Sequence, residues 1–488
     1  MRLNNIILLL ITAAAISLVI SGCAVGPDYV PPDFEMPKSW NGWTDETEQA
    51  EESAPIRDLS SWWALLNDPV LDKLIARANE GNITLKEAYY RIAESQAAKR
   101  YAQGDFLPHA DVQSGYSRTR GSENTTFKGT NPNLHPMDIY SAGVTASWEV
   151  DMFGRIRRSV ESADAFLDAS QASYNDIIVS LNAAVASNYI ALRTLQERID
   201  YAQKNIVLQK ETLKLTDARF KSELVPELDV EQAKLNLANT EAAISSLEKA
   251  KAEVFNRLAI LLGGFPQDIR DDLSGSAPIP EVSPRIPKVL PINIIKQRPD
   301  IRAAEREYAA RNARIGAATA GMYPIATLNG SFFLDGIEPS DLHDMTSRAY
   351  SFGPRFDWNA FEGGKNLNTV RIEQARTEQA RLRYEQTVLT AVEEVENALA
   401  FYTEEKKRYQ ALERASRSSE KSVELAGSLY KSGLTDFQNV LDMERTLFIT
   451  QDELAESKGQ IIQEWIGVYK AFGGGWSQDT DYEKDTGR

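Results

Sequence analysis

The sequence predicts a mixed α/β membrane protein made of two copies of one repeat, each combining two β-strands with two very long helices. Three observations support this fold class. The 71 residues from Arg155 to Val225 contain neither glycine nor proline, and a continuous helix of that length runs roughly 105 Å. The second half of the chain repeats the landmarks of the first, and short alternating segments precede each long helix. Ordinary globular helices average about 11 to 12 residues. Two helices of this length therefore indicate a protein that extends over a long distance.

Four landmarks in the same order carry the internal duplication. GDFLPHADVQSGYS matches GMYPIATLNGSF, SWEVDMFGR matches RFDWNAFEGG, RFKSELVPELDV matches LYKSGLTDFQNV, and AILLGG matches YKAFGG. The offset between the copies changes only from 216 to 208 to 210 residues, which chance similarity does not explain. We therefore predict repeat 1 at 61–263 and repeat 2 at 300–475, joined by a proline-rich linker at 264–299.

The N-terminus is typical of a bacterial lipoprotein. An apolar run from Ile6 to Ile20 is too short for a bilayer span of about 20 residues, and the sequence ISGC follows it, ending at Cys23. We predict a signal peptide at 1–22 and a covalent N-acyl and S-diacylglycerol lipid on the cysteine, with no other cofactor. Residues 23–60 are expected to form a lipidated strap. Since the chain has one cysteine, disulfides are excluded.

Each repeat is expected to run helix, strand, loop, strand, very long helix, tight turn and return helix. Period-two alternation and the matched landmarks predict strands at about 109–119, 139–152, 324–334 and 348–360. The long helices are predicted at about 155–223 and 365–432, and the return helices at about 227–262 and 436–472. A C-terminal tail follows at 476–488.

Mostly apolar residues in the first long helix recur at alternating spacings of three and four from Ile178 to Phe220, and its return helix keeps the same rule. A strict seven-residue repeat requires a partner helix and a left-handed supercoil. The second copy is looser, and its register blurs at Lys406. We therefore expect each long helix to pack along its return helix as a coiled coil.

The four strands suit the wall of a membrane barrel, because each has about ten residues and aromatic ends, as transmembrane strands of about 9 to 11 residues do. In hydrocarbon, each unpaired backbone group costs several kcal/mol. Single-chain bacterial barrels have at least eight strands. Four strands therefore cannot close alone, and several copies of the chain must share one barrel.

Composition and motifs argue against other classes of protein. The chain has 70 acidic and 54 basic residues, for a net charge of −16, and no basic patch suited to nucleic acid stands out. The three histidines, His109, His135 and His343, lack metal-ligand spacing. Gly364 and Lys365 lack the flanking residues of a phosphate-binding loop. We expect neither an enzyme nor a metal site.

The combined motifs resemble the TolC-like outer membrane factors, in their lipoprotein (NodT-type) branch. The resemblance covers essentially the whole mature chain and includes the lipobox, GPDYVPP, WWALLNDPVLDKLIARAN, SWEVDMFGR, QRPDIRAAE, DWNAFEGG and the two helix-turn motifs. It implies a homotrimer with a 12-stranded outer-membrane β-barrel and a 12-helix periplasmic coiled-coil α-barrel. It also implies a location in the outer membrane, lipid-anchored and membrane-spanning, with extension into the periplasm.

The function implied by the resemblance is a passive exit duct for small molecules in a tripartite efflux system. Its partners would be a periplasmic adaptor protein, an inner-membrane pump of the resistance-nodulation-division (RND) type and outer-membrane lipid, with no nucleic acid. Two alternatives stay open: an exit duct for type I protein or peptide secretion, and a periplasmic coiled-coil scaffold lipoprotein. Export of metal cations is also possible, although seven methionines and three histidines form no obvious relay.

The resemblance places the two helix turns at the periplasmic tip and gives their residues roles. It assigns Asp229, Asp442, Tyr430 and Asn439 to a periplasmic gate, where repeated carboxylates would favour cations. The alternative is that both aspartates only stabilise helix N-termini, as acids do in any helix. The adaptor is expected to dock on Ser222, Leu224, Val225, Ser432, Gly433, Leu434 and Thr435. Glu223 occupies the place of a family glycine.

Overall fold

The computed structural model describes residues 24–41, 59–122, 136–273, 275, 277–280, 286 and 291–477. Cys23, the signal peptide and His135 lie outside the described residues. The chain divides into two compact units. Unit 1 comprises Met1–Pro32, Ile92–Ser170 and Ala304–Tyr384, and unit 2 comprises Asp33–Arg91, Gln171–Ala303 and Glu385–Arg488.

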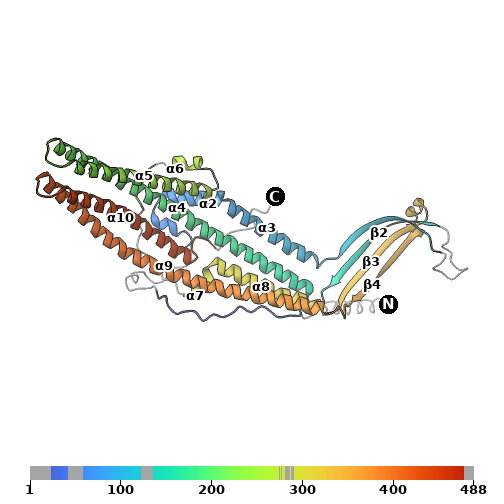
Figure 1. Cartoon of the computed structure of the whole chain (residues 1–488). Coiled ribbons are helices and arrows are strands. Elements are labelled where there is room, and N and C mark those ends of the chain that lie inside the picture. Colours follow the sequence, from blue (N-terminus) through green and yellow to red (C-terminus); the bar gives the residue numbers. More distant parts are fainter. Residues whose placement is uncertain are drawn as a thin grey trace. The chain divides into compact units, whose positions relative to one another are not determined.

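Unit 1 contains a four-stranded antiparallel sheet in the order β1–β2–β3–β4 (Figure 1). Its strands are β1 (His109–Thr119), β2 (Met137–Val150), β3 (Ile325–Gly336) and β4 (Arg348–Asp357). The hairpins β1–β2 and β3–β4 come from the two halves of the chain and join through β2 and β3, where Val144 pairs with Phe332. Strands β1 and β4 therefore form the two edges of the sheet.

Three strands differ from their predicted bounds. β2 begins two residues early, at Met137, which pairs with Thr119 of β1. It also ends two residues early, because the Asp151 carboxylate accepts hydrogen bonds from the Ile156 and Arg157 N–H groups at 3.1 and 2.9 Å. These bonds cap the following helix, so the chain has already left the sheet. β3 begins after Pro324, which has no N–H to donate, and continues to Gly336. β4 ends at Asp357, three residues before the predicted end.

The strand register gives the sheet one apolar and one polar face. The side that carries Tyr140 and Trp148 of β2 also carries Val112, Val144, Leu328, Phe332, Tyr350, Phe352 and Phe356. The other side carries Asp111, Gln113, Ser141, Thr145, Ser147, Asn329, Ser331, Ser351 and Arg355. On the apolar side Val112 is 84% exposed and Phe352 is 77% exposed. Apolar-out and polar-in alternation is the pattern of transmembrane barrel walls.

The main helices are α2 (Pro69–Gly81), α3 (Ile83–Gly104), α4 (Arg155–Lys221), α5 (Glu227–Leu261), α8 (Pro299–Ala320), α9 (Lys365–Lys431) and α10 (Phe437–Ala471). The first predicted helix is in fact two helices that break at Asn82. The Asn82 carboxamide accepts a bond from the Leu85 N–H and donates one to the Leu261 carbonyl, both at 2.9 Å. This side chain therefore starts α3 and fixes its first turn against the end of α5.

The proline-rich linker is not free of helix. It contains the 3-10 helix η4 (Pro266–Ile269) and the short helices α6 (Arg270–Leu273) and α7 (Pro291–Gln297). Pro266 and Pro291 are the first residues of η4 and α7. Proline is tolerated there because its missing N–H would be unpaired in any case.

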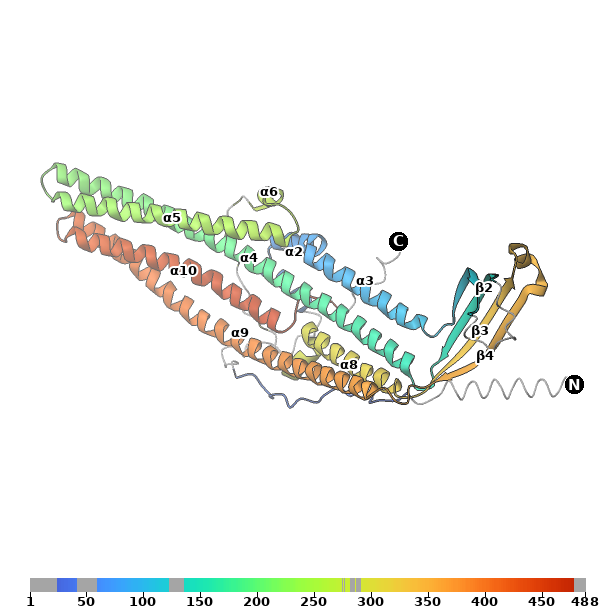
Figure 2. The ribbon, with the colours of Figure 1, turned by 45° about the vertical axis from the view of Figure 1, so that its right-hand side comes forward.

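In unit 2, α4 pairs with α5 and α9 pairs with α10 as two antiparallel hairpins (Figures 1 and 2). Leu195, Ile199 and Ala202 of α4 pack against Leu247 of α5, as the heptad positions predict. The heptad does not predict that Asn182, Ala186 and Thr194, on other faces of α4, are also buried. Thr194 is buried because α10 packs closely against it at Gly459. A Cβ at Gly459 would lie only 1.9 Å from Thr194 Oγ1.

The expected loss of register around Lys406 is confirmed, because no residue between Thr403 and Ser416 is buried. Buried residues then resume along α9 at spacings of three, seven and four, at Ser416, Ser419, Ala426 and Tyr430. Small and polar residues occupy several of these positions, so the hydrophobic pattern fades while the packing continues. Ser419 Oγ, for example, shares a 2.8 Å hydrogen bond with Thr450 Oγ1 of α10.

Candidate functional site

The two helix turns in unit 2 have the same backbone hydrogen bonds. In the first turn the Leu224 N–H donates to the Arg219 carbonyl, and in the second the Leu434 N–H donates to the Leu429 carbonyl, both at 2.9 Å. These bonds close the C-terminal ends of α4 and α9 and direct the leucine side chains outward. Leu224 is 66% exposed and Leu434 is 75% exposed. Of the other predicted docking residues, Ser222, Ser432 and Gly433 are exposed. Val225 and Thr435 are partly buried.

Glu223 adopts a left-handed backbone with φ of 60°, the conformation that Gly433 adopts at φ of 71° in the second turn. A residue with a Cβ is strained there, whereas glycine is not. This conformation also explains why α4 ends at Lys221, two residues before its predicted end. Glu223 therefore strains the first turn, although the backbone there has the same left-handed conformation as at Gly433 in the second turn.

Replacing Glu223 with glycine should therefore stabilise the protein. We expect Glu223→Gly to raise the free energy of unfolding by about 1 kcal/mol, because it removes the left-handed strain. Thermal unfolding of the purified protein measures the change. In the control, Lys221→Gly, glycine replaces a residue with helical geometry and should destabilise by about 1 kcal/mol. Equal effects of the two glycines would contradict the strain.

Arg219 links the two hairpins beside these turns. Its guanidinium stacks on the Tyr430 ring, 4.6 Å from the ring centroid, and it donates an N–H to the Tyr430 carbonyl. The tyrosine is buried and packs against Phe437, with ring centroids 5.4 Å apart. Sequence reasoning found Tyr430 but missed Arg219. The sequence feature that could have revealed Arg219 is its position as a basic residue in the last turn of a helix, where backbone carbonyl groups lack partners.

Asp229 lies near the same junction and is partly buried. Burial raises the pKa of its carboxyl group, the Asp436 carboxylate raises it further, and Arg219 lowers it. Asp436 is the N-cap residue of α10. Two carboxylates that repel each other and one guanidinium therefore meet where the hairpins join.

The structure keeps the remaining predicted gate residues apart from this group. Asp442 is exposed on α10, where it accepts a 2.9 Å hydrogen bond from Gln438. Asn439 is also exposed and donates to Thr435 Oγ1 at 2.8 Å. The single chain therefore places Asp229 and Tyr430 at the junction of the hairpins and Asp442 and Asn439 on an open helix face.

A groove with a volume of about 560 Å³ lies between α4 and α9 beside the junction. Val440 and Glu444 of α10 also line it. Glu444 is only 1% exposed, and its carboxylate accepts hydrogen bonds from Thr212 Oγ1 at 2.5 Å and Asn236 Nδ2 at 3.3 Å. Burial raises the pKa of Glu444, and these two hydrogen bonds lower it. Three helices thus converge on one buried acid that the sequence pattern did not single out.

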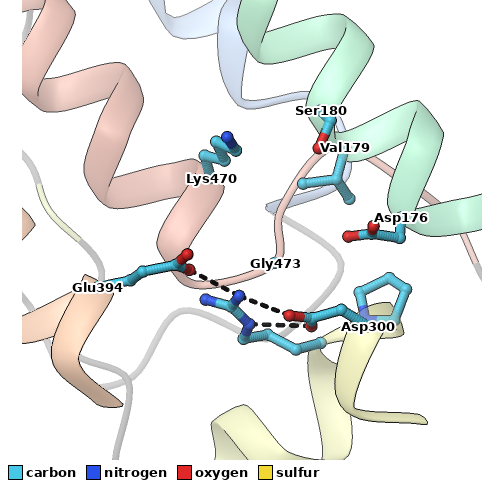
Figure 3. Close-up of a pocket in the computed structure, with 9 residues that line it drawn as sticks. Asp176, Val179, Ser180, Asp300, Glu394, Lys470 and Gly473 are labelled. Carbon is cyan, nitrogen blue, oxygen red and sulfur yellow. Dashed lines mark hydrogen bonds and ion pairs between the residues drawn. The ribbon is translucent and has the colours of Figure 1, made fainter. Parts of the chain in front are cut away.

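A second charged site lies where α4, α8, α9 and α10 meet in unit 2 (Figure 3). It surrounds a cavity of about 180 Å³. Arg298 is 8% exposed and donates to the Asp300 carboxylate at 3.0 and 2.7 Å, to Glu394 at 2.7 Å and to the Ala471 carbonyl at 2.9 Å. The Arg and Asp of the QRPD motif thus join the start of α8 to α9 and to the end of α10.

Asp176 of α4 faces the same cavity (Figure 3). Burial and the nearby Asp300 carboxylate raise its pKa to about 6, against the opposing effect of Arg298 and Lys470. The folded protein therefore binds this proton more tightly than the unfolded chain does. The resulting cost to stability is absent below about pH 4 and complete above about pH 6.

We expect Asp176→Asn to remove this cost. The variant should be more stable than the wild type by roughly 1 to 3 kcal/mol above pH 6, and the advantage should vanish near pH 4. Thermal unfolding across pH 4 to 8 measures it. Asp200→Asn, which changes an exposed carboxylate paired with Lys204 at 2.6 Å, is the matched control and should show no such gain. A pH-independent effect of Asp176→Asn would contradict the shifted titration.

Comparison with known protein families gives a match over most of the chain. Residues 74–264 and 290–474 match the family described as outer membrane efflux protein. The two matched segments correspond to the two halves that carry the sequence duplication.

Individual proteins are similar over nearly their full length. The chain is 30% identical to nodulation protein T of Rhizobium leguminosarum bv. trifolii, with 96% of the chain and 97% of that protein aligned. It is 28% identical to the outer membrane protein OprJ of Pseudomonas aeruginosa, with 96% of each covered. Among solved structures, the outer-membrane channel OprN superposes with a TM-score of 0.86 at 32% identity, over 93% of this chain and all of that one.

Proposed function

The chain belongs to the outer membrane efflux protein family, and from this premise we propose that three copies form the exit duct of a tripartite pump. As a family member it is an outer-membrane efflux channel that extends into the periplasm. The proposal adds a homotrimer with a 12-stranded barrel and a 12-helix α-barrel, and two partners: a periplasmic adaptor and an inner-membrane RND-type pump. Passage through such a duct is passive and needs no catalytic group.

The open sheet is the observation that supports the trimer. One face of its four strands is apolar and exposed, and β1 and β4 are both edge strands. In a membrane the unpaired N–H and C=O groups of these edges would each cost several kcal/mol. Pairing β1 of one copy with β4 of the next removes both edges, and three copies supply twelve strands, an even number within the range of known barrels.

The proposed lipid anchor agrees with how the strap docks. Cys23 directly precedes a segment whose Val25 N–H donates to the Phe153 carbonyl at 3.1 Å, just after β2. Arg158, with a side chain 6% exposed, donates to Asp28 at 2.6 Å and to the Val25 carbonyl at 3.3 Å. The strap is therefore fixed beside the end of the sheet, where an acyl chain on Cys23 would enter the same membrane as the barrel wall.

The tip is proposed to dock the adaptor and to gate the duct. Leu224 and Leu434 are exposed in the two equivalent turns, so each hairpin ends in an apolar side chain that a partner can contact. The proposed docking residues are Ser222, Leu224, Val225, Ser432, Gly433, Leu434 and Thr435, and the proposed gate residues are Asp229, Asp442, Tyr430 and Asn439. Arg219 joins the gate as the residue that holds the two hairpins together.

Planar-bilayer recording tests the proposed function. The purified protein should run as a heat-modifiable trimer and form a conducting pore. A scaffold lipoprotein would show neither property. The proposal would be overturned if the protein remained a soluble monomer in detergent-free buffer and formed no pore after reconstitution. Cells that lack the gene distinguish the two kinds of cargo. They should accumulate small molecules if the duct serves efflux, and a secreted protein or peptide if it serves secretion.

Removing the gate carboxylates should widen the closed tip. We expect Asp229→Ala combined with Asp442→Ala to raise single-channel conductance, because the tip loses the charge interaction of Asp229 with Arg219 and the hydrogen bond from Gln438 to Asp442. Cation selectivity should fall, because less negative potential remains across the pore. Asp200→Ala, which removes an exposed carboxylate paired with Lys204 on α4, is the matched control. Unchanged conductance and selectivity in the double variant would remove both aspartates from the gate.

A further inference from the structure

Two arginines of α8 share one aromatic ring of α4 in unit 1. The guanidinium carbon of Arg314 lies 5.1 Å from the centroid of the Phe166 ring, and that of Arg311 lies 5.4 Å from it. A ring holds a planar guanidinium by cation-π attraction without using its N–H groups. Both guanidinium groups therefore lie against the same ring, and this contact leaves their N–H donors available.

The charges around this pair do not cancel. Arg311 has one loose acidic partner, Glu307 at 3.7 Å, which also lies 3.6 Å from Arg383. Within the described residues, Arg314 has no carboxylate in ion-pair range, and its hydrogen bond goes to Ser162 Oγ at 3.4 Å. The chain as a whole carries a net charge of −16. The pair therefore keeps an excess of positive charge within a protein that is acidic overall.

A third arginine adds to the positive field. Arg376 of α9 pairs with Glu373 at 2.6 Å. Burial lowers the pKa of Arg314, the charges of Arg311 and Arg376 lower it further, and Glu373 opposes them. Two neighbouring cations and one carboxylate, which is itself paired with Arg376, therefore act on Arg314. An anion placed beside its N–H groups would offset the positive charge that remains.

Guanidinium chemistry narrows the class of anion. The planar fork of N–H donors fits the paired oxygens of a phosphate or a carboxylate. A phosphate has more oxygens than a carboxylate, so two neighbouring arginines can each bind oxygens of the same phosphate. Phosphate is therefore the anion that we consider for this pair.

The position of the pair favours a membrane source. The Trp358 indole N–H donates to the Met322 carbonyl at 3.1 Å, just before β3, and tryptophan marks the membrane interface. Arg314 is six residues before the end of α8 at Ala320, a rise of about 9 Å. Bilayer headgroup layers are about 5 to 8 Å deep on each side. A long arginine side chain can bridge the remaining distance.

We propose that Arg311 and Arg314, stacked on Phe166, bind the phosphate of a phospholipid headgroup at the periplasmic side of the outer membrane. The inference rests on the sheet being the membrane wall, but not on the cargo or the partners of the channel. Phe166 acts as a positioning residue, because it orients the arginines without touching the anion. The bound lipid would seal the protein where the barrel wall meets the helices.

Native mass spectrometry of the full-length protein tests the proposal. The probes are phosphatidylglycerol, diacylglycerol, which has the same chains without phosphate, and inorganic phosphate. We expect the wild type to retain phosphatidylglycerol and to bind diacylglycerol at least tenfold more weakly. The double variant Arg311→Gln and Arg314→Gln should lose at least tenfold in affinity for phosphatidylglycerol. Unchanged retention in that variant would overturn the proposal.

Further variants separate charge, geometry and source. Arg311→Lys with Arg314→Lys keeps the charge but loses the stacked fork, and Phe166→Leu keeps both arginines but not their support, so each should weaken binding severalfold. Arg417→Gln, at an exposed arginine paired with Glu413 at 2.6 Å, should change nothing. Binding of inorganic phosphate without phospholipid would overturn the assignment to a headgroup. Conductance of the double variant stays as in the wild type, so failure of this site is distinguishable from failure of the channel.

Discussion

Arg298→Ala should lower the free energy of unfolding by about 3 kcal/mol, because it leaves the partly buried Asp300 carboxylate without its cation and a buried carbonyl without its donor. Asp300 and Glu394 would lose ion pairs at 2.7 Å each, and the Ala471 carbonyl would lose a buried donor. Asp176, which already has a raised pKa, faces the same cavity. The melting temperature of the purified protein and its yield in the outer membrane both measure the loss.

Two controls make this test specific. Arg417→Ala removes an exposed arginine from α9, and exposed ion pairs contribute at most about 1 kcal/mol. Arg298→Lys keeps the charge but cannot make the same set of bonds, so it should fall between alanine and the wild type. If Arg298→Ala unfolds at the same temperature as Arg417→Ala, the guanidinium does not hold α8, α9 and α10 together.

The combined substitution of Leu224→Asp and Leu434→Asp should abolish export while leaving a folded, conducting protein. Both leucines are largely exposed, so folding loses little. A docked partner would bury them, and burying a carboxylate without a counter-charge costs several kcal/mol, where each 1.4 kcal/mol is a factor of ten in affinity. Drug susceptibility should reach that of a strain lacking the gene.

The matched control for this prediction is Ile337→Asp, which changes a 65% exposed apolar residue in the connection between β3 and β4. It should export normally. Bilayer conductance and heat-modifiable migration must be preserved in the double variant for its export defect to count as a docking defect. Full drug resistance in that variant would show that the two turns do not carry the docking surface.

Local patterns in the sequence predicted much of the fold. The absence of glycine and proline between Arg155 and Val225 predicted a long helix, and α4 runs from Arg155 to Lys221. Alternation predicted β2, whose register then separates apolar from polar side chains. Both signals lie within one segment of the chain, so the backbone geometry of a single helix or strand is enough to interpret them.

The candidate sites depended more on pairs of residues distant in sequence. Arg219 meets Tyr430 across 211 residues, and Arg298 meets Ala471 across 173. No periodicity marks such pairs. Residues such as Ser416 and Ser419 are buried although they are polar, so hydrophobic patterning alone did not show that the packing of α9 resumes there.

The sequence by itself predicted the four strands and the two pairs of long helices that the described residues form, because hydrophobic period and chain breakers can be read along a single segment. Only the tertiary structure decided which charges meet: the Arg298 site, the Arg219 link between the hairpins and the arginine pair on Phe166. Burial and the distance between side chains set the strength of a charge interaction, and both become defined only when helices from separate parts of the chain pack together.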